Sequence, residues 1–167
     1  MRFGLKDKKQ LLMLFLIVLT VLFIFVQSML PPELSMKESE AVSDAIFDDD
    51  ADEDSPFANF IRVSLRKIAH FAEYGILAAE TFVFLLFSSV KDDESVLPIG
   101  IKKLLFSLNF GLIVAFLDES IQIISSREAK VKDVWIDVFG YATFTVLSLL
   151  IVFIVRNAKY RRSSKID

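Results

Sequence analysis

The sequence predicts an all-α integral membrane protein, a four-helix bundle with an acidic extracytoplasmic loop. Hydrophobic residues make up 54% of the 167-residue chain, whereas roughly 45–50% is average for soluble domains even with glycine counted. Four apolar stretches are each close to the ~20 residues that a helix needs to cross a bilayer. Charged residues gather between these stretches and at the ends of the chain, which is typical of a multi-pass membrane protein.

The first apolar stretch, Leu11–Leu30, carries no charge and follows a basic N-terminus. A secretory signal peptide also starts with basic residues, but its apolar core is usually ~7–15 residues long and precedes a small-residue cleavage site. This stretch is longer and ends at Pro31 and Pro32. We therefore assign residues 1–30 to a cytoplasmic N-terminus and a retained transmembrane helix.

The rest of the chain divides by charge and hydropathy. Residues 31–60 are rich in Asp and Glu and are predicted to form the acidic extracytoplasmic loop, since such runs are usually solvated. Residues 61–155 contain three further apolar stretches, at about 65–90, 104–124 and 134–155, and residues 156–167 form a basic tail. Basic residues favour the cytoplasmic side of a membrane, so we expect both termini there.

Ionisable residues interrupt the last three apolar stretches, and such groups are costly at membrane depth unless they have a purpose. If consecutive helices run in opposite directions, the ionisable residues of all three stretches lie in the outer part of the membrane. The candidate site predicted in this way comprises Lys67, His70, Glu73, Tyr74, Asp118, Glu119, Gln122, Arg127, Asp133 and Asp137.

Helical periodicity also predicts which faces of these helices pack. In the second helix, the face opposite the ionisable residues is expected to meet lipid. This face consists of Phe71, Ala72, Gly75, Ile76 and Ala79. Gly111 and Gly140 are expected to allow close approach to neighbouring helices. Trp135 and Tyr141 are interpreted as interfacial anchoring or packing residues.

Two interpretations of the polar cluster remain open. It is either an ion-pair network that joins the helices or a pocket for a polar ligand, and the two can coexist. A chain without cysteine and with one histidine excludes thiolate and histidine-rich metal sites. Clustered carboxylates still allow a divalent cation. A proton-coupled transporter is less favoured, because no inverted repeat is evident.

Three motifs in order give the chain a family resemblance. They are Lys67-x-x-His70-Phe71-x-x-Tyr74-x-x-Leu77, then Asp118-Glu119-x-x-Gln122, then Arg127-x5-Asp133-x3-Asp137-x-x-Gly140. Over roughly residues 60–155 the chain resembles the VanZ-like proteins. That family usually has Asn where this chain has Asp137, so an amide-specific role does not carry over to this position.

The resemblance implies a small multi-pass protein of the bacterial cell membrane, in a family whose founding member is associated with teicoplanin resistance. The first functional hypothesis is non-catalytic, an outward-facing pocket that engages a lipid headgroup, a cell-wall precursor or the glycopeptide itself. Arg127, Lys67 and His70 would donate to phosphate or carboxylate groups. Beyond the lipid bilayer and this ligand, we expect no nucleic-acid partner and no cofactor.

The alternative hypothesis is a membrane enzyme acting on lipid phosphate or pyrophosphate. Ser126-Arg127-x5-Asp133-x3-Asp137 has the spacing of the last motif of type 2 phosphatidic acid phosphatases. Those enzymes carry a nucleophilic His where this chain has Asp133. An Asp nucleophile is chemically feasible, and the carboxylates would otherwise hold a divalent cation for the reaction.

Overall fold

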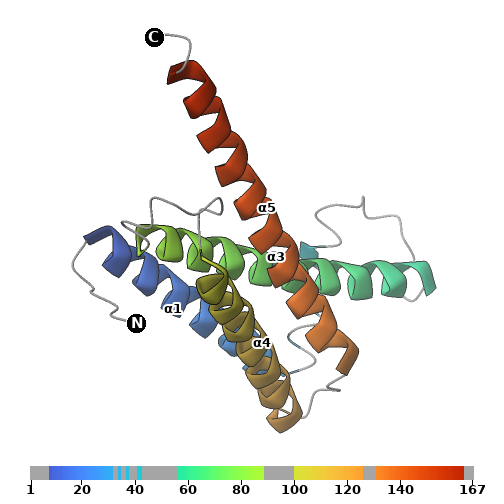
Figure 1. Ribbon diagram of the computed structural model, residues 1–167. Helices are drawn as coiled ribbons and strands as arrows, with labels where there is room; N and C mark the ends of the chain where they lie inside the picture. Colours follow the sequence, from blue (N-terminus) through green and yellow to red (C-terminus); the bar gives the residue numbers. More distant parts are fainter. Residues whose placement is uncertain are drawn as a thin grey trace.

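The part of the chain that the structure describes forms four long helices, shown in Figure 1. The computed structural model describes residues 8–31, 34, 37, 41–42, 56–88, 100–125 and 131–163, with the side chains of these ranges except 56–63 and 159–163. The helices are α1 (Lys8–Met29), α3 (Pro56–Phe87), α4 (Ile101–Ile124) and α5 (Val131–Ser163). Each contains a segment long and apolar enough to cross a membrane, so the predicted four-helix membrane class is confirmed.

Two helices extend past their predicted apolar stretches. α3 begins at Pro56, inside the range assigned to the acidic loop, and α5 continues to Ser163, inside the basic tail. Apolar content marks only the part of a helix inside the hydrocarbon layer, whereas backbone hydrogen bonds continue into polar sequence. At 1.5 Å per residue α3 is ~48 Å long, well beyond the ~30 Å hydrocarbon core. Most of the acidic loop lies outside the described residues.

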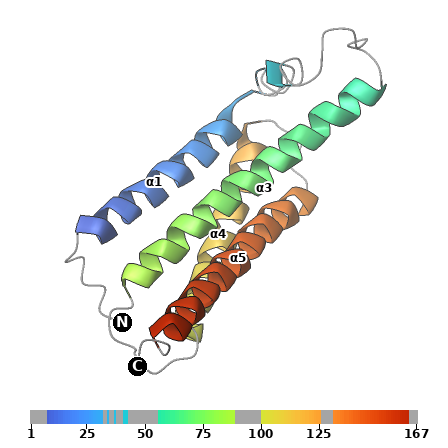
Figure 2. The ribbon, with the colours of Figure 1, turned by 90° about the horizontal axis from the view of Figure 1, so that it is seen from above.

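The four helices are arranged in a ring, and α3 contacts all three of the other helices. α1 packs on α3, α3 on α5, α5 on α4 and α4 on α1, and α3 also contacts α4 across the ring. Figure 2 shows α3 running between α1 and α5, which lie at opposite corners. α3 must therefore bury side chains toward three neighbours, while α1 and α5 leave most of their surface to the surroundings.

The core lies along α3 and repeats with helical spacing. Its buried α3 residues follow one another at intervals of about one helical turn, as expected for a face turned to the interior. They are Tyr74, Leu77, Ala78, Thr81, Phe82 and Leu85. Ile17 and Ile24 of α1 and Val114 and Ala115 of α4 pack with Tyr74, Leu77 and Ala78. Phe82 and Leu85 form a second cluster, against which Leu149 and Val152 of α5 pack. This packing fixes the rotation of each helix and hence the direction of its polar residues.

Glycine brings α3 and α5 together. A Cβ added at Gly140 would lie 2.5 Å from the main-chain oxygen of Phe71, so only glycine fits this contact. At Gly75 an added Cβ would lie 2.6 Å from the ring of Phe144. The predicted close approach at Gly140 is confirmed. The predicted lipid face is wrong for Phe71 and Gly75, because both residues pack against α5.

A second close approach joins α4 to α5. A Cβ at Gly111 would lie 2.6 Å from the ring of Tyr141, which confirms the prediction for this glycine. The hydroxyl groups of Tyr141 and Ser107 are hydrogen-bonded at 2.9 Å in the interior. Tyr141 is thus a packing residue, whereas Trp135 on the same helix is 66% exposed and has the position of an interfacial residue.

Polar side chains from α1 and α4 meet the end of α3. Gln10 Nε2 donates to the Phe87 carbonyl at 2.9 Å, and Lys103 Nζ donates to the Ser88 carbonyl at 3.2 Å. The last carbonyl groups of a helix have no partner within it, so these two side chains satisfy groups that would otherwise face the bilayer boundary. They also tie three helices together at the end of the bundle opposite the candidate site.

Candidate functional site

The candidate site lies where the end of α1, the first half of α3, the end of α4 and the start of α5 meet. Because consecutive helices run in opposite directions, the chain delivers these four segments to the same end of the bundle (Figure 1). The buried residues of α4 run down one face to this point, from Ser107 and Gly111 to Asp118 and Gln122. Their spacing of four or seven positions explains why one helix face carries them all.

Asp118 of α4 is fully buried and has donors from two helices. Ser28 Oγ of α1 donates to its Oδ1, and Gln122 Nε2 donates to its Oδ2 at 3.3 Å. Ser125 adds a link between the same helices, donating to the main-chain oxygens of Ser28 at 2.9 Å and of Gln122 at 3.1 Å. These bonds hold the Asp118 carboxylate in one orientation between α1 and α4.

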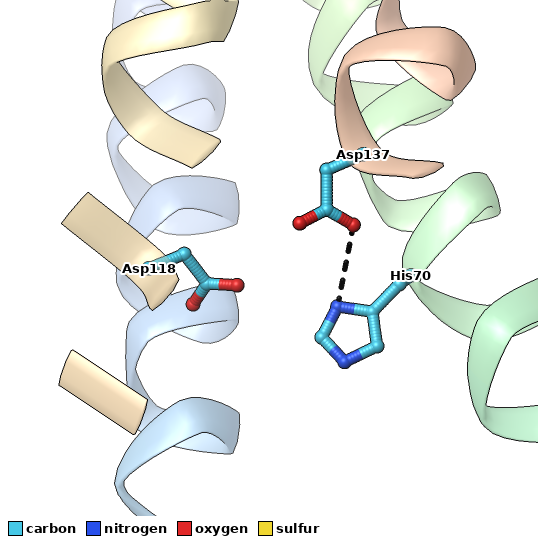
Figure 3. Close-up of side chains that lie close together, drawn as sticks. All are labelled: His70, Asp118 and Asp137. Atoms are coloured by element: carbon cyan, nitrogen blue, oxygen red, sulfur yellow. Dashed lines mark ion pairs between the residues drawn. The ribbon is translucent and has the colours of Figure 1, made fainter. Parts of the chain in front are cut away.

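Asp137 of α5 lies opposite and is supported differently. Its Oδ1 is 3.6 Å from His70 Nδ1 of α3, with the aspartate 1% and the histidine 22% exposed. A hydrogen bond between such atoms is typically ~2.7–3.2 Å, so this is an ion-pair distance without a hydrogen bond. Neither carboxylate oxygen of Asp137 has a hydrogen-bond donor among the described residues. Figure 3 shows Asp137, His70 and Asp118 pointing into one space from three helices.

Further acidic and hydroxyl groups surround this trio. Glu73 and the buried Tyr74 lie within electrostatic range of Asp118. Glu119 is 7% exposed and lies within electrostatic range of Asp137, as do Asp133 and Glu73. No described Lys or Arg side chain is buried, so negative groups dominate this interior.

The structure brings together most of the predicted site residues and separates others from them. His70, Glu73, Tyr74, Asp118, Glu119, Gln122 and Asp137 gather in the interior. Asp133 is half-buried at the start of α5 and Lys67 is exposed. Arg127 lies outside the described residues. Of the three cationic donors expected from sequence, His70 is the one that the described structure places in the cluster.

Sequence reasoning missed Ser28, which donates to the central aspartate. Its signal was nevertheless present, because Thr20, Gln27 and Ser28 are the only polar residues between Leu11 and Leu30. Thr20 lies beside the Glu80 carboxylate of α3, deeper in the bundle. Hydroxyls in an otherwise apolar helix therefore mark the face of α1 that meets the polar residues of its neighbours.

The arrangement has two chemical capacities. Its excess of carboxylate oxygens accepts hydrogen bonds from hydroxyl or amine groups, while His70 offers a base or a donor. His70, Asp118 and Asp137 can also supply one ligand atom each, all within 4.8 Å of one another, to a metal ion. The carboxylates and the imidazole lie among helices whose outer faces are apolar, so a ligand would reach them from the membrane or its surface.

Fold and site together define a multi-pass membrane protein with a polar cluster enclosed at one end of a four-helix bundle. The family model described as VanZ/LLP1 matches residues 13–154, which is most of the chain. The protein belongs to this family. Comparison with curated proteins and with solved structures gave no match.

Proposed function

We propose that this protein acts in the bacterial cell envelope by engaging the polar headgroup of a membrane lipid or lipid-linked cell-wall precursor at the end of the bundle that holds Asp118. The observation that carries the proposal is the meeting of two buried aspartates, Asp118 and Asp137, with the half-buried His70 around one space between three helices. Burying charged groups is costly without compensation. A ligand with hydroxyl or amine donors would supply that compensation.

Charge at the opposite end of the bundle supports an outward-facing site. Lys8, Lys9, Lys102 and Lys103 lie where α1 and α4 begin, and the last two carry the positive charge expected of a cytoplasmic loop. The cluster end would then face the cell exterior, where lipid-linked precursors and glycopeptides meet. Membership of the VanZ/LLP1 family makes a contribution to teicoplanin tolerance the first phenotype to test.

The test is teicoplanin and vancomycin susceptibility in a Gram-positive host that expresses the wild type, Asp118→Asn or Arg127→Ala at matched membrane levels. We expect the wild type to raise tolerance to teicoplanin and both variants to lose this effect. Glu80→Gln is the matched control, since it neutralises an α3 carboxylate away from the cluster and should keep the effect. Equal susceptibility of wild-type and empty-vector cells would contradict the proposal.

A second candidate function is hydrolysis of lipid phosphate or pyrophosphate within the membrane. The specific observation in its favour is the imidazole of His70 beside Asp137 and across from Asp118, an arrangement in which a base and a carboxylate nucleophile lie close together. Release of phosphate from a lipid pyrophosphate by the purified protein, lost in Asp118→Asn but kept in Glu80→Gln, would favour the enzyme. No release at any divalent-cation concentration would leave the binding function.

A further inference from the structure

We propose that His70, Asp118 and Asp137 form a binding site for one divalent transition-metal ion, such as Mn²⁺ or Zn²⁺, between α3, α4 and α5. The proposal deepens the function proposed above and rests on it only for the role of the metal. The metal would neutralise the two aspartates and offer an open coordination position to a phosphate or hydroxyl of the headgroup.

The three side chains form a donor set that suits such an ion. One imidazole and two carboxylates from three helices place a ligand atom each within 4.8 Å of one another. Atoms bound to one tetrahedral zinc ion at ~2.0–2.2 Å lie ~3.3–3.6 Å apart, so side-chain movements of about 1 Å would bring these three atoms to that spacing. Three protein ligands and an open position are the usual form of a catalytic or substrate-binding zinc site.

The distance between His70 and Asp137 also suits a shared metal ion. Two ligands of a tetrahedral zinc ion lie ~3.3–3.6 Å apart, and His70 Nδ1 and Asp137 Oδ1 are separated by 3.6 Å. A direct hydrogen bond would bring these atoms closer. The spacing therefore fits two groups that share a cation better than two groups bonded to each other.

Asp137 itself points to a bound cation, independently of the clustering. The residue is 1% exposed, its two carboxylate oxygens have no hydrogen-bond donor among the described residues, and it points into the space between His70 and Asp118 (Figure 3). Buried polar atoms in folded proteins nearly always have a partner. Glu73, Glu119 and Asp133 add negative charge around it, so a bound cation would supply the partner that the described residues do not.

Asp118 is held in place by hydrogen bonds from α1 and α4. Ser28 and Gln122 donate to its two oxygens and orient the carboxylate toward the other two ligands. Groups that hydrogen-bond to metal ligands fix their orientation, and their loss typically weakens metal binding 10–100-fold. α1 would thus contribute to the site without providing a ligand.

The test uses the full-length protein in detergent micelles, purified without a histidine tag, stripped with a chelator and titrated with Mn²⁺ alone. Because the chain has a single histidine, nitrogen coupling to bound Mn²⁺ in pulsed electron paramagnetic resonance reports His70 and no other side-chain imidazole. We expect one Mn²⁺ per chain with this coupling, displaced by an equivalent of Zn²⁺. Bound Mn²⁺ without nitrogen coupling, or no saturable binding, would overturn the proposal.

Variants separate this site from the acidic segment around Asp48–Asp50. His70→Gln and Asp137→Asn should weaken Mn²⁺ binding at least ~10-fold, Ser28→Ala should weaken it 10–100-fold, and Glu80→Gln should leave it unchanged. Undiminished Mn²⁺ binding by His70→Gln and Asp137→Asn would overturn the proposal. If a variant fails to fold, the nitrogen coupling of Mn²⁺ bound to the wild type still shows whether His70 is a ligand. Metal binding is measured without lipid or drug, so its failure is distinguishable from an unchanged susceptibility of cells.

Discussion

At the scale of single residues, the two buried aspartates have opposite environments. Asp118 accepts hydrogen bonds from Ser28 and Gln122, whereas Asp137 has His70 at 3.6 Å and no hydrogen-bond donor among the described residues. A carboxylate with two donors is held in place by the protein itself. A buried carboxylate without donors needs another partner. Asp137 is therefore the residue that indicates a metal ion, whereas Asp118 links α1 to α4.

The first prediction concerns that link. Ser28→Ala removes a buried donor to a carboxylate, and hydrogen bonds to charged groups contribute about 1.5–3 kcal/mol, while polar contacts between membrane helices average about 0.6 kcal/mol. We expect a loss of about 1–2 kcal/mol and a lower melting temperature in detergent.

Ser120→Ala is the control for Ser28→Ala. Ser120 is exposed on α4, and its hydroxyl donates to the Phe116 carbonyl within the same helix at 2.7 Å. This substitution should stay within about 0.5 kcal/mol of the wild type. Equal melting temperatures for the two variants would show that the Ser28–Asp118 bond contributes nothing to stability.

At the scale of elements, α3 and α5 approach through glycine, and this contact sets the distance between His70 and Asp137. The Phe71 ring packs against Phe139 and Phe144 of α5 with centroid distances of 6.0 Å. Gly140, three residues after Asp137, meets the backbone of Phe71, one residue after His70. The Gly140–Phe71 contact therefore lies next to the His70–Asp137 pair, and a change in the helix spacing at the glycine also changes the distance between His70 and Asp137.

The second prediction follows from this contact. Gly140→Ala would place a Cβ 2.5 Å from the Phe71 carbonyl oxygen, a backbone atom that only a shift of α3 or α5 can move away. Overpacking usually costs about 1–3 kcal/mol, which exceeds the roughly 1 kcal/mol that alanine gains over glycine inside a helix. We expect a lower melting temperature in detergent.

Gly100→Ala is the control for Gly140→Ala. An added Cβ at Gly100 meets nothing within 4 Å, so the helices need not move. Its effect should stay below about 1 kcal/mol, the usual size of a change at a helix N-cap. If Gly140→Ala were as stable as this control, the α3–α5 approach would have to be looser than the structure has it.

At the scale of the whole molecule, the bundle has two unlike ends. One holds the buried acidic cluster, and the other holds lysines that begin α1 and α4, with Gln10 and Lys103 satisfying the last carbonyls of α3. The outer faces between the two ends are apolar, since most large hydrophobic side chains of α1 and α5 are exposed. The molecule is therefore built to lie across a bilayer with its ends in different compartments.

The third prediction fixes which end faces which compartment. The chain has no cysteine, so single cysteines can be introduced at exposed positions at either end. Lys132→Cys, at the start of α5, should react with a membrane-impermeant maleimide in intact cells. Lys102→Cys, at the start of α4, should react only after permeabilisation. The reverse pattern would place the cluster in the cytoplasm and remove the basis for an outward-facing headgroup site.

Much of the candidate site was predictable, because ionisable residues are rare in apolar stretches and their depth follows from helix direction. Asp118, Asp137 and His70 were found in this way. Lys67 was included by the same reasoning but is exposed, since the charge of a residue does not reveal whether its helix face turns inward. Ser28 was missed because the prediction depended on ionisable residues, and the three polar residues of the first apolar stretch are uncharged.

The sequence by itself determined the membrane class, the four helices and the meeting of the polar residues at one level. These properties depend on each segment's own polarity and length relative to the bilayer, which sequence records directly. Only the tertiary structure decided that α3 lies between α1 and α5, that Gly75 and Phe71 face α5 and not lipid, and that Ser28 reaches Asp118. Helix rotation and the choice of neighbours arise from the fit of whole surfaces, and no single segment contains that information.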